Sequence, residues 1–326
     1  MKAVVYTDYG SPNVLAIREI KRPVPDDDQV LVKVRAASVN PLDWHFIEGT
    51  PYIMRLGVGL RKPKVPRLGV DFAGVVEAVG KNVTQFKVGD DVFGGKTGAF
   101  AEYVCMRADR ALALKPTNIS FEQAAAVPIA GLTALQGLRD KGHVGPGQRV
   151  LINGASGGVG TFAVQIAKSL GAEVTGVCST RNLELVHSLG ADHVIDYTKE
   201  DFTKGNERYD VILDNVGNQP LSGFRHTLKP KGICVMIGGG GPNDGGLIGP
   251  MGRPVKALLM SPFVSQKMSM FMAELTGADL TAMADLMQSG KVTPVIDKTY
   301  PLSLIADAIR YLEAGHARGK VVVIPD

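Results

Sequence analysis

Residues 149–160, RVLINGASGGVG, place an apolar run directly before a glycine-rich turn, and the segment TFAVQIAK that follows has the pattern of a helix. The turn has the spacing G-x-x-G-x-x-G and consists of Gly154, Ala155, Ser156, Gly157, Gly158, Val159 and Gly160. Small residues let the backbone approach a pyrophosphate, and the N–H groups and dipole of a helix start favour its charge. Strand, turn and helix in this order predict the phosphate-binding turn of a Rossmann half, with all residues of the turn as cofactor contacts.

Alternating strand and helix patterns continue after the turn. Candidate strands cover residues 173–179, 193–197, 209–217 and 233–239, and candidate helices cover residues 159–171, 182–190 and 221–232. This alternation is typical of parallel strands, because each helix crosses back over the sheet before the next strand begins. The predicted fold class is therefore α/β, with a doubly wound parallel sheet.

The chain up to about residue 122 has a different pattern. Valine-rich runs alternate with clusters of Gly, Pro and Asp, which predicts short strands joined by turns in a barrel-like domain. A candidate helix at residues 121–138 joins this part to the Rossmann domain, and the terminal run KVVVIP returns to the first domain. We predict a first domain of residues 1–122 and 266–326 and a cofactor domain of residues 123–265.

The composition indicates a globular protein with little net charge. The formal net charge of +4 gives little reason to expect nucleic acid as a partner. The N-terminus lacks the pattern of a signal peptide, and no run of about 18 apolar residues could span a membrane. The cysteines Cys105, Cys178 and Cys234 are far apart, as expected in a reducing compartment. These features predict a cytoplasmic protein without a membrane partner.

The residues after the second strand of the Rossmann pattern indicate which nicotinamide cofactor binds. NAD-specific sites have a carboxylate about 20 residues after the glycines, which accepts a hydrogen bond from the ribose 2′-hydroxyl. This chain has Ser179, Thr180 and Arg181 there instead, and hydroxyls beside a guanidinium suit a 2′-phosphate. We predict NADP(H), with Ser179 and Arg181 as contacts. The alternative is that Arg181 is a solvated charge at the start of a helix.

Further cofactor contacts are expected at the carboxyl edge of the sheet, where open α/β sheets bind their ligands. Asn215 and Gly217 follow the strand VILD, and Gly238 follows the strand ICVMI. Thr133, in the helix that joins the two domains, can reach the nicotinamide phosphate. The alternative for the glycines is that they are turn residues.

Several further segments are informative together, namely PRLGVDFAGVVEAVG, VGDDVFGG, GAFAEYV, AAAVPIAGLTAL, LGADHVIDY and GKVVV. With the glycine turn, they resemble the medium-chain dehydrogenase/reductase superfamily and its quinone oxidoreductase-like branch, over essentially the whole chain. The resemblance implies a GroES-like first domain, a Rossmann domain, and a homodimer that pairs through an edge strand of the sheet. It also implies that Tyr197 packs beside the 2′-phosphate.

Zinc alcohol dehydrogenases of this superfamily bind their catalytic metal through a Cys, a Gly-His-Glu segment and a second Cys. The matching positions here hold Asn40, the segment Gly69-Val70-Asp71, and Ile129, which are not a set of tetrahedral zinc ligands. The four-cysteine loop of a structural zinc site is also missing, and the histidines show no metal-binding spacing. The resemblance is therefore to zinc-independent members, and no metal is expected.

Without a Lewis acid, hydride transfer suits an acceptor that delocalises the incoming charge, such as a quinone or an enone. The candidate catalytic residues are Asn40, whose amide can donate a hydrogen bond, and Tyr52, a phenol in a Pro/Gly-containing loop. Related quinone oxidoreductases place an Asn and a Tyr near the nicotinamide; Asn40 matches that Asn, and the match of Tyr52 is offset by about one residue. The alternatives are that Tyr52 anchors its own loop and that water protonates the product. For the neighbours Asp43 and Trp44, a turn stabiliser and a core aromatic are the favoured interpretations.

Two features have more than one interpretation. The basic loop, residues 55–67, is favoured as a solvated surface loop, with a lid over the cofactor or substrate as the alternative. A group of methionines fits an adaptable pocket, a subunit contact or core filling equally well, and its members are Met260, Met268, Met270 and Met272.

The leading hypothesis is an NADPH-dependent, zinc-free reductase of quinones or α,β-unsaturated carbonyls. One alternative is a metal-free NADP-dependent alcohol dehydrogenase or enoyl thioester reductase, which the basic loop would favour. Another is an NADPH-binding sensor or structural protein without turnover. The physiological acceptor, the proton donor, and the choice between one- and two-electron quinone reduction stay open at the level of sequence.

Overall fold

The structure, a computed structural model, describes residues 1–237 and 265–326. These residues form two compact units. The first unit contains Met1–Leu132 and Glu274–Asp326, and the second contains residues 133–237 and 265–273. The division falls inside helix α4 (Pro128–Gln136), later in the chain than the predicted boundary near residue 122.

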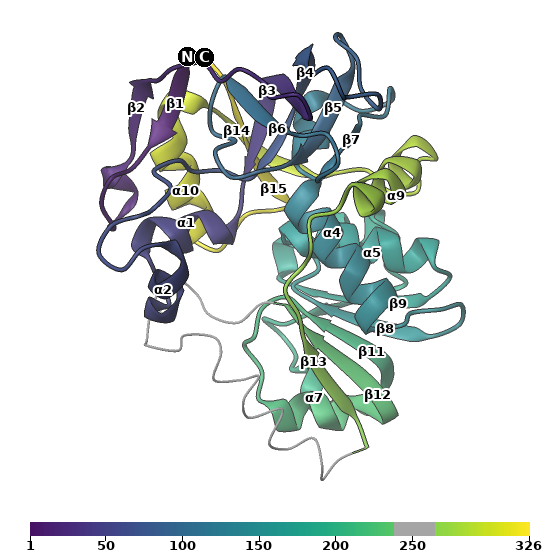
Figure 1. Cartoon of the computed structure of the whole chain (residues 1–326). Helices are drawn as coiled ribbons and strands as arrows, with labels where there is room; N and C mark the ends of the chain where they lie inside the picture. The colour runs from purple at the N-terminus through teal and green to yellow at the C-terminus, as the bar shows by residue number, and fades with distance from the viewer. Residues whose placement is uncertain (238–264) are drawn as a thin grey trace. The chain divides into compact units, whose positions relative to one another are not determined.

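The second unit is built on one parallel sheet, as the alternation of patterns predicted (Figure 1). Its strands follow the order β10 (His193–Asp196), β9 (Glu173–Cys178), β8 (Arg149–Asn153), β11 (Tyr209–Asp214), β12 (Leu228–Met236) and β13 (Lys267–Met270). All neighbours in this order are parallel. The direction of winding reverses between β8 and β11, and an open α/β sheet binds its ligand beside such a reversal. The predicted α/β fold class is confirmed.

Helices connect the parallel strands, and they are α5 (Gly158–Ser169), α6 (Leu183–Ser188) and α7 (Leu221–Thr227). Short 3₁₀ turns are formed by Thr180–Asn182 and Phe202–Lys204. Helix α7 ends at Thr227 rather than near residue 232, because Pro230 disfavours helical backbone at Lys229 and the chain enters β12 at Leu228. Strand β13 pairs with β12, so the sheet continues past the predicted domain boundary at residue 265.

The first unit is a barrel-like sheet with a separate hairpin, as the alternation of Val-rich runs and turns predicted. The sheet follows the order β14 (Ile296–Pro301), β15 (Lys320–Ile324), β3 (Gln29–Val39), β4 (Asp71–Val79), β5 (Asp91–Gly95) and β7 (Leu112–Leu114), and β6 (Tyr103–Arg107) also pairs with β3. The hairpin consists of β1 (Lys2–Val5) and β2 (Ala16–Glu19). Neighbouring strands are antiparallel except β14 and β15, which are parallel.

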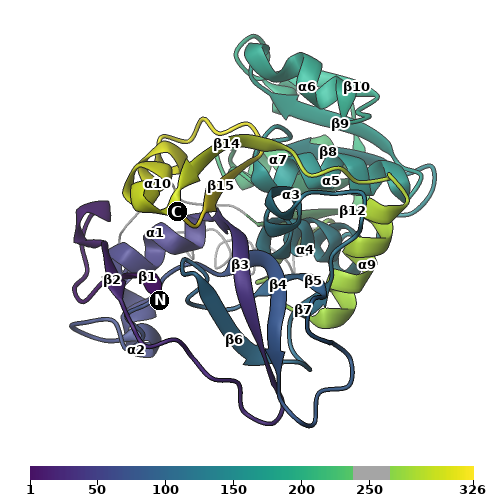
Figure 2. The same ribbon diagram turned by 90° about the horizontal axis from the view of Figure 1, so that it is seen from above.

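The helices of the first unit are α1 (Pro41–Glu48), α2 (Arg55–Val58), α3 (Phe121–Ala125), α9 (Gly277–Gln288) and α10 (Ile305–Glu313), with 3₁₀ turns at Pro12–Val14, Tyr52–Met54 and Leu302–Leu304. Figure 2 shows α10 beside β14 and β15. The single helix predicted at residues 121–138 is divided, because Pro128 has no N–H to extend α3 and instead begins α4. A π-helical turn, Gly137–Lys141, follows α4. No helix in residues 1–237 and 265–326 has the length and apolar content needed to cross a membrane.

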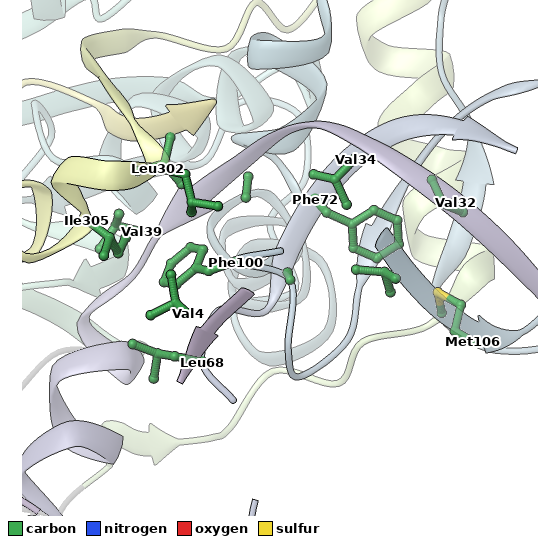
Figure 3. Close-up of a cluster of buried hydrophobic side chains, with 14 of the residues drawn as sticks. Val4, Val32, Val34, Val39, Leu68, Phe72, Phe100, Met106, Leu302 and Ile305 are labelled. Atoms are coloured by element: carbon green, nitrogen blue, oxygen red, sulfur yellow. The ribbon is translucent and has the colours of Figure 1, made fainter. Parts of the chain in front are cut away.

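Strand β3 provides the centre of the core in the first unit. Val32 and Val34 are buried, whereas Lys33 between them is exposed, as the alternation of side chains along a strand requires. Figure 3 shows both valines with Phe72 of β4 and with Phe100. Each such apolar side chain stabilises the fold by roughly 1.5–3 kcal/mol when it is fully buried.

The register of three neighbouring strands determines which polar residues meet. Ser38 of β3 lies opposite Asp71 of β4, and Val39 of β3 lies opposite Val321 of β15. Because side chains alternate between the two faces of a strand, a slip of one residue would turn each of them to the other face. The observed register brings Ser38, Asp71 and Lys320 to the same end of the sheet.

Candidate functional site

Each unit contains one candidate site. In the first unit, buried polar side chains meet where β3 ends and where β4 and β15 begin. Ser38 and Asp71 are fully buried, Asn40 is 2% exposed, and Lys320 is 3% exposed. We call these four residues the Asp71 cluster. Since burial of polar and charged groups costs free energy, each member has to find partners within the fold.

The Asp71 carboxylate is the centre of this cluster. Its Oδ2 accepts hydrogen bonds from Ser38 Oγ at 2.9 Å and from Asn40 Nδ2 at 2.8 Å. Its Oδ1 accepts from the backbone N–H of Ile129, in the first turn of α4, at 3.1 Å. Lys320 Nζ lies 3.5 Å from Asp71 Oδ2 and donates to Asn40 Oδ1 at 2.5 Å. The carboxylate therefore connects β3, β15 and the first turn of α4.

Burial and charge act on this ion pair in opposite directions. Burial raises the pKa of Asp71, while the Lys320 ammonium and the hydrogen bonds to the carboxylate oppose the rise. Burial lowers the pKa of Lys320, while the Asp71 carboxylate opposes that change. Each charge thus offsets part of the desolvation penalty of the other.

Asp43 is a second buried carboxyl group, next to the cluster. Its Oδ2 accepts from the backbone N–H of Asn40 at 2.8 Å, so Asp43 stabilises the turn that begins α1, as predicted. Its Oδ1 is buried without a hydrogen-bond partner in the described part of the chain. Burial raises the pKa of Asp43 to about 7; the N–H of Asn40 opposes the rise, the Asp71 carboxylate adds to it, and Lys320 opposes it. Near neutral pH, Asp43 is therefore partly protonated.

The two predicted catalytic residues have different surroundings. Asn40 lies inside the cluster, where Nδ2 donates to Asp71 and also makes a longer contact of 3.4 Å with Ser38 O. Tyr52 is 50% exposed, and its ring centre lies 4.8 Å from the guanidinium carbon of Arg55. The fold therefore orients the amide of Asn40, whereas Tyr52 is half exposed beside Arg55. A catalytic role for either residue stays a prediction.

Side chains of the basic loop contact neighbouring segments of the first unit. Arg55 donates from Nε to Gly49 O and from Nη2 to Glu48 O, both at 2.9 Å, and so caps the C-terminus of α1. Lys62 forms an exposed ion pair with Asp8 at 3.2 Å. These contacts favour a surface loop over a lid.

The positions that match zinc ligands in the alcohol dehydrogenases do meet in space. Asn40 and the N–H of Ile129 both donate to Asp71, and the Lys320 ammonium lies beside Asn40 and Asp71. Zinc binds deprotonated donor atoms, whereas this set presents N–H groups and a positive charge, so these residues do not fit a zinc ion. Across residues 1–237 and 265–326, no group of three or more His, Cys, Asp and Glu side chains is arranged to hold a metal.

The candidate site of the second unit contains the glycine-rich turn between β8 and α5. Gly154 has a left-handed backbone, with φ of +79°, and Gly157 is the N-cap residue of α5. A Cβ on Gly160 would lie 2.1 Å from the carbonyl oxygen of Gly154, so this close approach of backbone requires glycine. The first N–H groups of a helix have no acceptors within it and can bind a phosphate. The turn therefore fits the pyrophosphate of a dinucleotide.

The loops after β9 and β10 lie near this turn. Asn182 Nδ2 donates to Ser156 Oγ at 2.9 Å and to Ser179 Oγ at 3.3 Å, which connects the glycine turn to the loop after β9. The backbone N–H of Tyr197 donates to the last residue of β9, and its side chain is 54% exposed. Arg181 is exposed in the same loop as Ser179. The structure thus brings Ser156, Ser179 and Tyr197 to one edge of the sheet.

A carboxylate does lie at the end of β10, but protein groups occupy it. Asp196 accepts from Thr180 Oγ1 at 2.5 Å on one oxygen and from Thr198 Oγ1 at 2.7 Å on the other. The Thr180 hydroxyl and the Thr198 donors hold the pKa of Asp196 below its usual range. Because both oxygens already accept hydrogen bonds, Asp196 does not resemble the ribose acceptor of an NAD-specific site.

The loop after β11 is held against the end of β8, where the strand order reverses. Asp214 Oδ1 accepts from Asn153 Nδ2 at 2.9 Å and from Gly217 N at 3.0 Å, and Asn215 Nδ2 donates to Asn153 O at 3.0 Å. Asn215 Oδ1 is buried and has no hydrogen-bond partner among the described residues. Buried polar atoms are nearly always paired, so this oxygen is available to a ligand.

The other predicted contacts are Thr133, which is buried in α4, and Gly238, which lies outside the described residues. Sequence reasoning did not identify Asp214 or Lys320, although both hold predicted site residues in place. Lys320 is the one charged residue of β15, and Asp214 ends β11 directly after the apolar run Val211–Leu213. A charge at such a position requires a partner, and this pattern could have identified both.

Two family models match the chain. The model described as "Alcohol dehydrogenase GroES-like domain" matches residues 26–116, and the model described as "Zinc-binding dehydrogenase" matches residues 189–323. The first match lies within the barrel-like unit, and the second begins in the parallel-sheet unit.

Relatives align along the whole chain. The 2-methylene-furan-3-one reductase of Solanum lycopersicum is 37% identical over 345 residues, which cover 100% of this chain and 79% of the relative. The chloroplastic NADPH-dependent alkenal/one oxidoreductase of Arabidopsis thaliana is 37% identical and covers 100% and 80% of the two chains. The structure of the quinone oxidoreductase from Coxiella burnetii superposes with a TM-score of 0.85 at 31% identity, over 99% of each chain.

Replacement of Gly160 tests the phosphate-binding turn. Gly160→Ala is expected to weaken NADPH binding about tenfold or more, because the added methyl group would displace the turn from the pyrophosphate. Fluorescence titration measures the Kd. Gly145→Ala is the matched control, since a Cβ there meets nothing within 4 Å. A folded Gly160→Ala protein with the wild-type Kd contradicts the assignment.

Asp43 predicts a pH dependence of stability. A carboxyl group with a raised pKa binds its proton more tightly in the folded state, so its contribution to the unfolding free energy falls between about pH 4 and about pH 7. Asp43→Asn lacks this titration, so its stability relative to wild type should increase with pH across that range. Denaturant unfolding at several pH values measures the difference, with the exposed Asp27→Asn as control. Parallel curves for wild type and Asp43→Asn would refute the prediction.

Proposed function

The chain belongs to the medium-chain dehydrogenase/reductase superfamily, in its quinone oxidoreductase-like branch, and we propose that it is an NADPH-dependent reductase of quinones and α,β-unsaturated carbonyl compounds. The observation that supports this most is a dinucleotide-binding turn in a chain where the positions that match zinc ligands meet around Asp71, beside the Lys320 ammonium. Relatives named for the reduction of a furanone, of alkenals and of quinones support the acceptor class.

NADPH, when bound, supplies a hydride to the acceptor. We propose that the glycine turn binds its pyrophosphate at the start of α5 and that Ser179 and Arg181 bind the 2′-phosphate beside Tyr197. Asn215 and Gly217, at the reversal of strand order, are proposed to contact the nicotinamide half of the cofactor. Thr133 and Gly238 are proposed as further contacts. The engaged oxygens of Asp196 support the preference for a 2′-phosphate over a free 2′-hydroxyl.

We propose that Asn40 and Tyr52 assist the acceptor. Reduction of an enone or quinone places negative charge on an oxygen, which hydrogen-bond donors stabilise. Asn40 has one N–H in only a long contact with Ser38 O, and Tyr52 has an exposed phenol, so both have a donor to offer. Full activity in Tyr52→Phe would leave water as the proton source.

We also propose that the protein is a cytoplasmic homodimer. Among residues 1–237 and 265–326, strand β13 is at one end of the sheet order and pairs with β12, and we propose that its other edge pairs with a second copy. Light scattering on gel-filtered protein tests this, with two chains expected in each particle. Cys105, Cys178 and Cys234 form no disulfide, as expected in a reducing compartment.

The loss of NADPH absorbance tests the reaction. Turnover is expected with quinones, alkenals or enones, because their own π-systems accept the negative charge. The same assay is also run with alcohols and NADP⁺, and with enoyl thioesters and NADPH. Turnover of either of these in place of quinones and enones would replace the proposal with the corresponding dehydrogenase or thioester reductase. NADPH binding without any turnover would indicate a sensor or structural protein.

Arg181 tests the choice of cofactor. Arg181→Ala is expected to lower the ratio of kcat/KM for NADPH to that for NADH by about tenfold or more, because a charged hydrogen bond to the 2′-phosphate is lost. Lys204→Ala is the control, since Lys204 is an exposed cation of the same unit with a partner of its own. An unchanged ratio of kcat/KM in Arg181→Ala would show that Arg181 does not bind the 2′-phosphate.

A further inference from the structure

The Asp71 cluster contains a cation, the Lys320 ammonium, beside its central carboxylate, although its residues do not fit the zinc ion in the name of the matching family model. We propose that the Lys320 ammonium and the Asp71 carboxylate, as a buried ion pair, position Asn40 and the first turn of α4 for the reaction. Both are positioning residues, because each acts through Asn40 or α4 and neither is assigned a contact with substrate. The kinetic part of this inference rests on the proposed reductase function.

Two opposite charges determine which way the amide of Asn40 points. Its oxygen accepts from the Lys320 ammonium at 2.5 Å, and its nitrogen donates to the Asp71 carboxylate at 2.8 Å. A rotated amide would place N–H against the ammonium and oxygen against the carboxylate, and both contacts would be repulsive. The second N–H of Asn40 therefore has one fixed direction, in which its contact is the long one to Ser38 O.

The same carboxylate fixes the start of α4. Asp71 Oδ1 accepts from Ile129 N, and a negative charge at a helix N-terminus is favourable. Ile129 lies one turn before Thr133, the cofactor contact proposed on that helix. Asp71 thus links the orientation of Asn40 to the placement of the helix that contains Thr133.

A neutral amide cannot replace this carboxylate. Asp71 accepts from Ser38 and Asn40 on Oδ2 and from Ile129 on Oδ1, so both of its oxygens must accept. An amide has one accepting oxygen and would present N–H to the donors on its other side. Asparagine at this position would release either Asn40 or α4.

The position of Lys320 in the cluster is also fixed by the backbone. Gly319 has φ of +99°, and a Cβ there would lie 2.4 Å from Val295 O. The backbone N–H of Lys320 donates to that same oxygen at 2.9 Å. The close approach allowed by Gly319 therefore determines where β15 begins and where the ammonium lies.

A double substitution separates positioning from stability. Asp71→Asn and Lys320→Met alone should each lower the Tm, because each leaves a buried charge without its partner. The double variant removes both charges and should regain much of that loss. Its kcat is expected to stay about tenfold or more below wild type, or exchange of the α4 amides to rise by a similar factor. The reason is that the amide which replaces the carboxylate can accept on one side only, so either Asn40 or the start of α4 loses its acceptor. Arg22→Met with Glu77→Gln is the matched control, since that ion pair is on the surface of the same unit.

Two readouts decide the inference. The first is the steady-state kcat with NADPH and an enone. The second is hydrogen–deuterium exchange of the peptide 128–136, compared with peptide 158–169 from α5. A folded double variant with wild-type kcat and wild-type α4 exchange overturns the inference. If the double variant does not fold, Lys320→Gln, which keeps a donor without the charge, replaces it: reduced kcat or faster α4 exchange supports the inference, and two wild-type values overturn it.

Failure of the proposed function would be recognised separately. In that case the wild-type protein itself turns over no acceptor. The exchange measurement does not require turnover, so it then decides the inference alone. Unchanged α4 exchange in the folded variant overturns it, and faster exchange confined to α4 supports it.

Discussion

A carboxylate without access to water is the constraint on which one end of the barrel depends. Asp71 begins β4 inside an apolar environment, and its desolvation is compensated by three hydrogen-bond donors and one cation. Those partners come from β3, from β15 and from the first turn of α4. The need to compensate one charge therefore brings together residues 38, 40, 129 and 320, which lie far apart in the chain.

The parts of the fold that could be predicted are those whose causes are local. The turn at Gly154–Gly160 is specified by its own glycines and by the strand and helix on either side of it. The alternation of strands and helices around the parallel sheet was predicted for the same reason. Boundaries were less well predicted where a single proline acts, as at Pro230 and at Pro128.

The Asp71 cluster could not be assembled from the sequence, because its contacts join residues far apart in the chain. Asn40 and Lys320 are 280 residues apart, and they meet through the register of β15 and β4 on either side of β3. Local patterns contain no information on register between distant strands. The sequence does show Asp71 and Lys320 as single charges in apolar runs, and pairing them requires only that buried charges be compensated.

The nature of the cation determines what chemistry the first unit can support. A metal ion can accept a lone pair from a substrate oxygen, whereas the Lys320 ammonium has no vacant position and already donates to Asn40. It can orient protein groups but cannot polarise a carbonyl as a Lewis acid does. The negative charge that follows hydride transfer must then be spread over the acceptor and met by hydrogen-bond donors. Quinones and enones meet this requirement because their conjugated π-systems delocalise the charge onto oxygen, whereas reduction of a simple ketone leaves the charge on one oxygen.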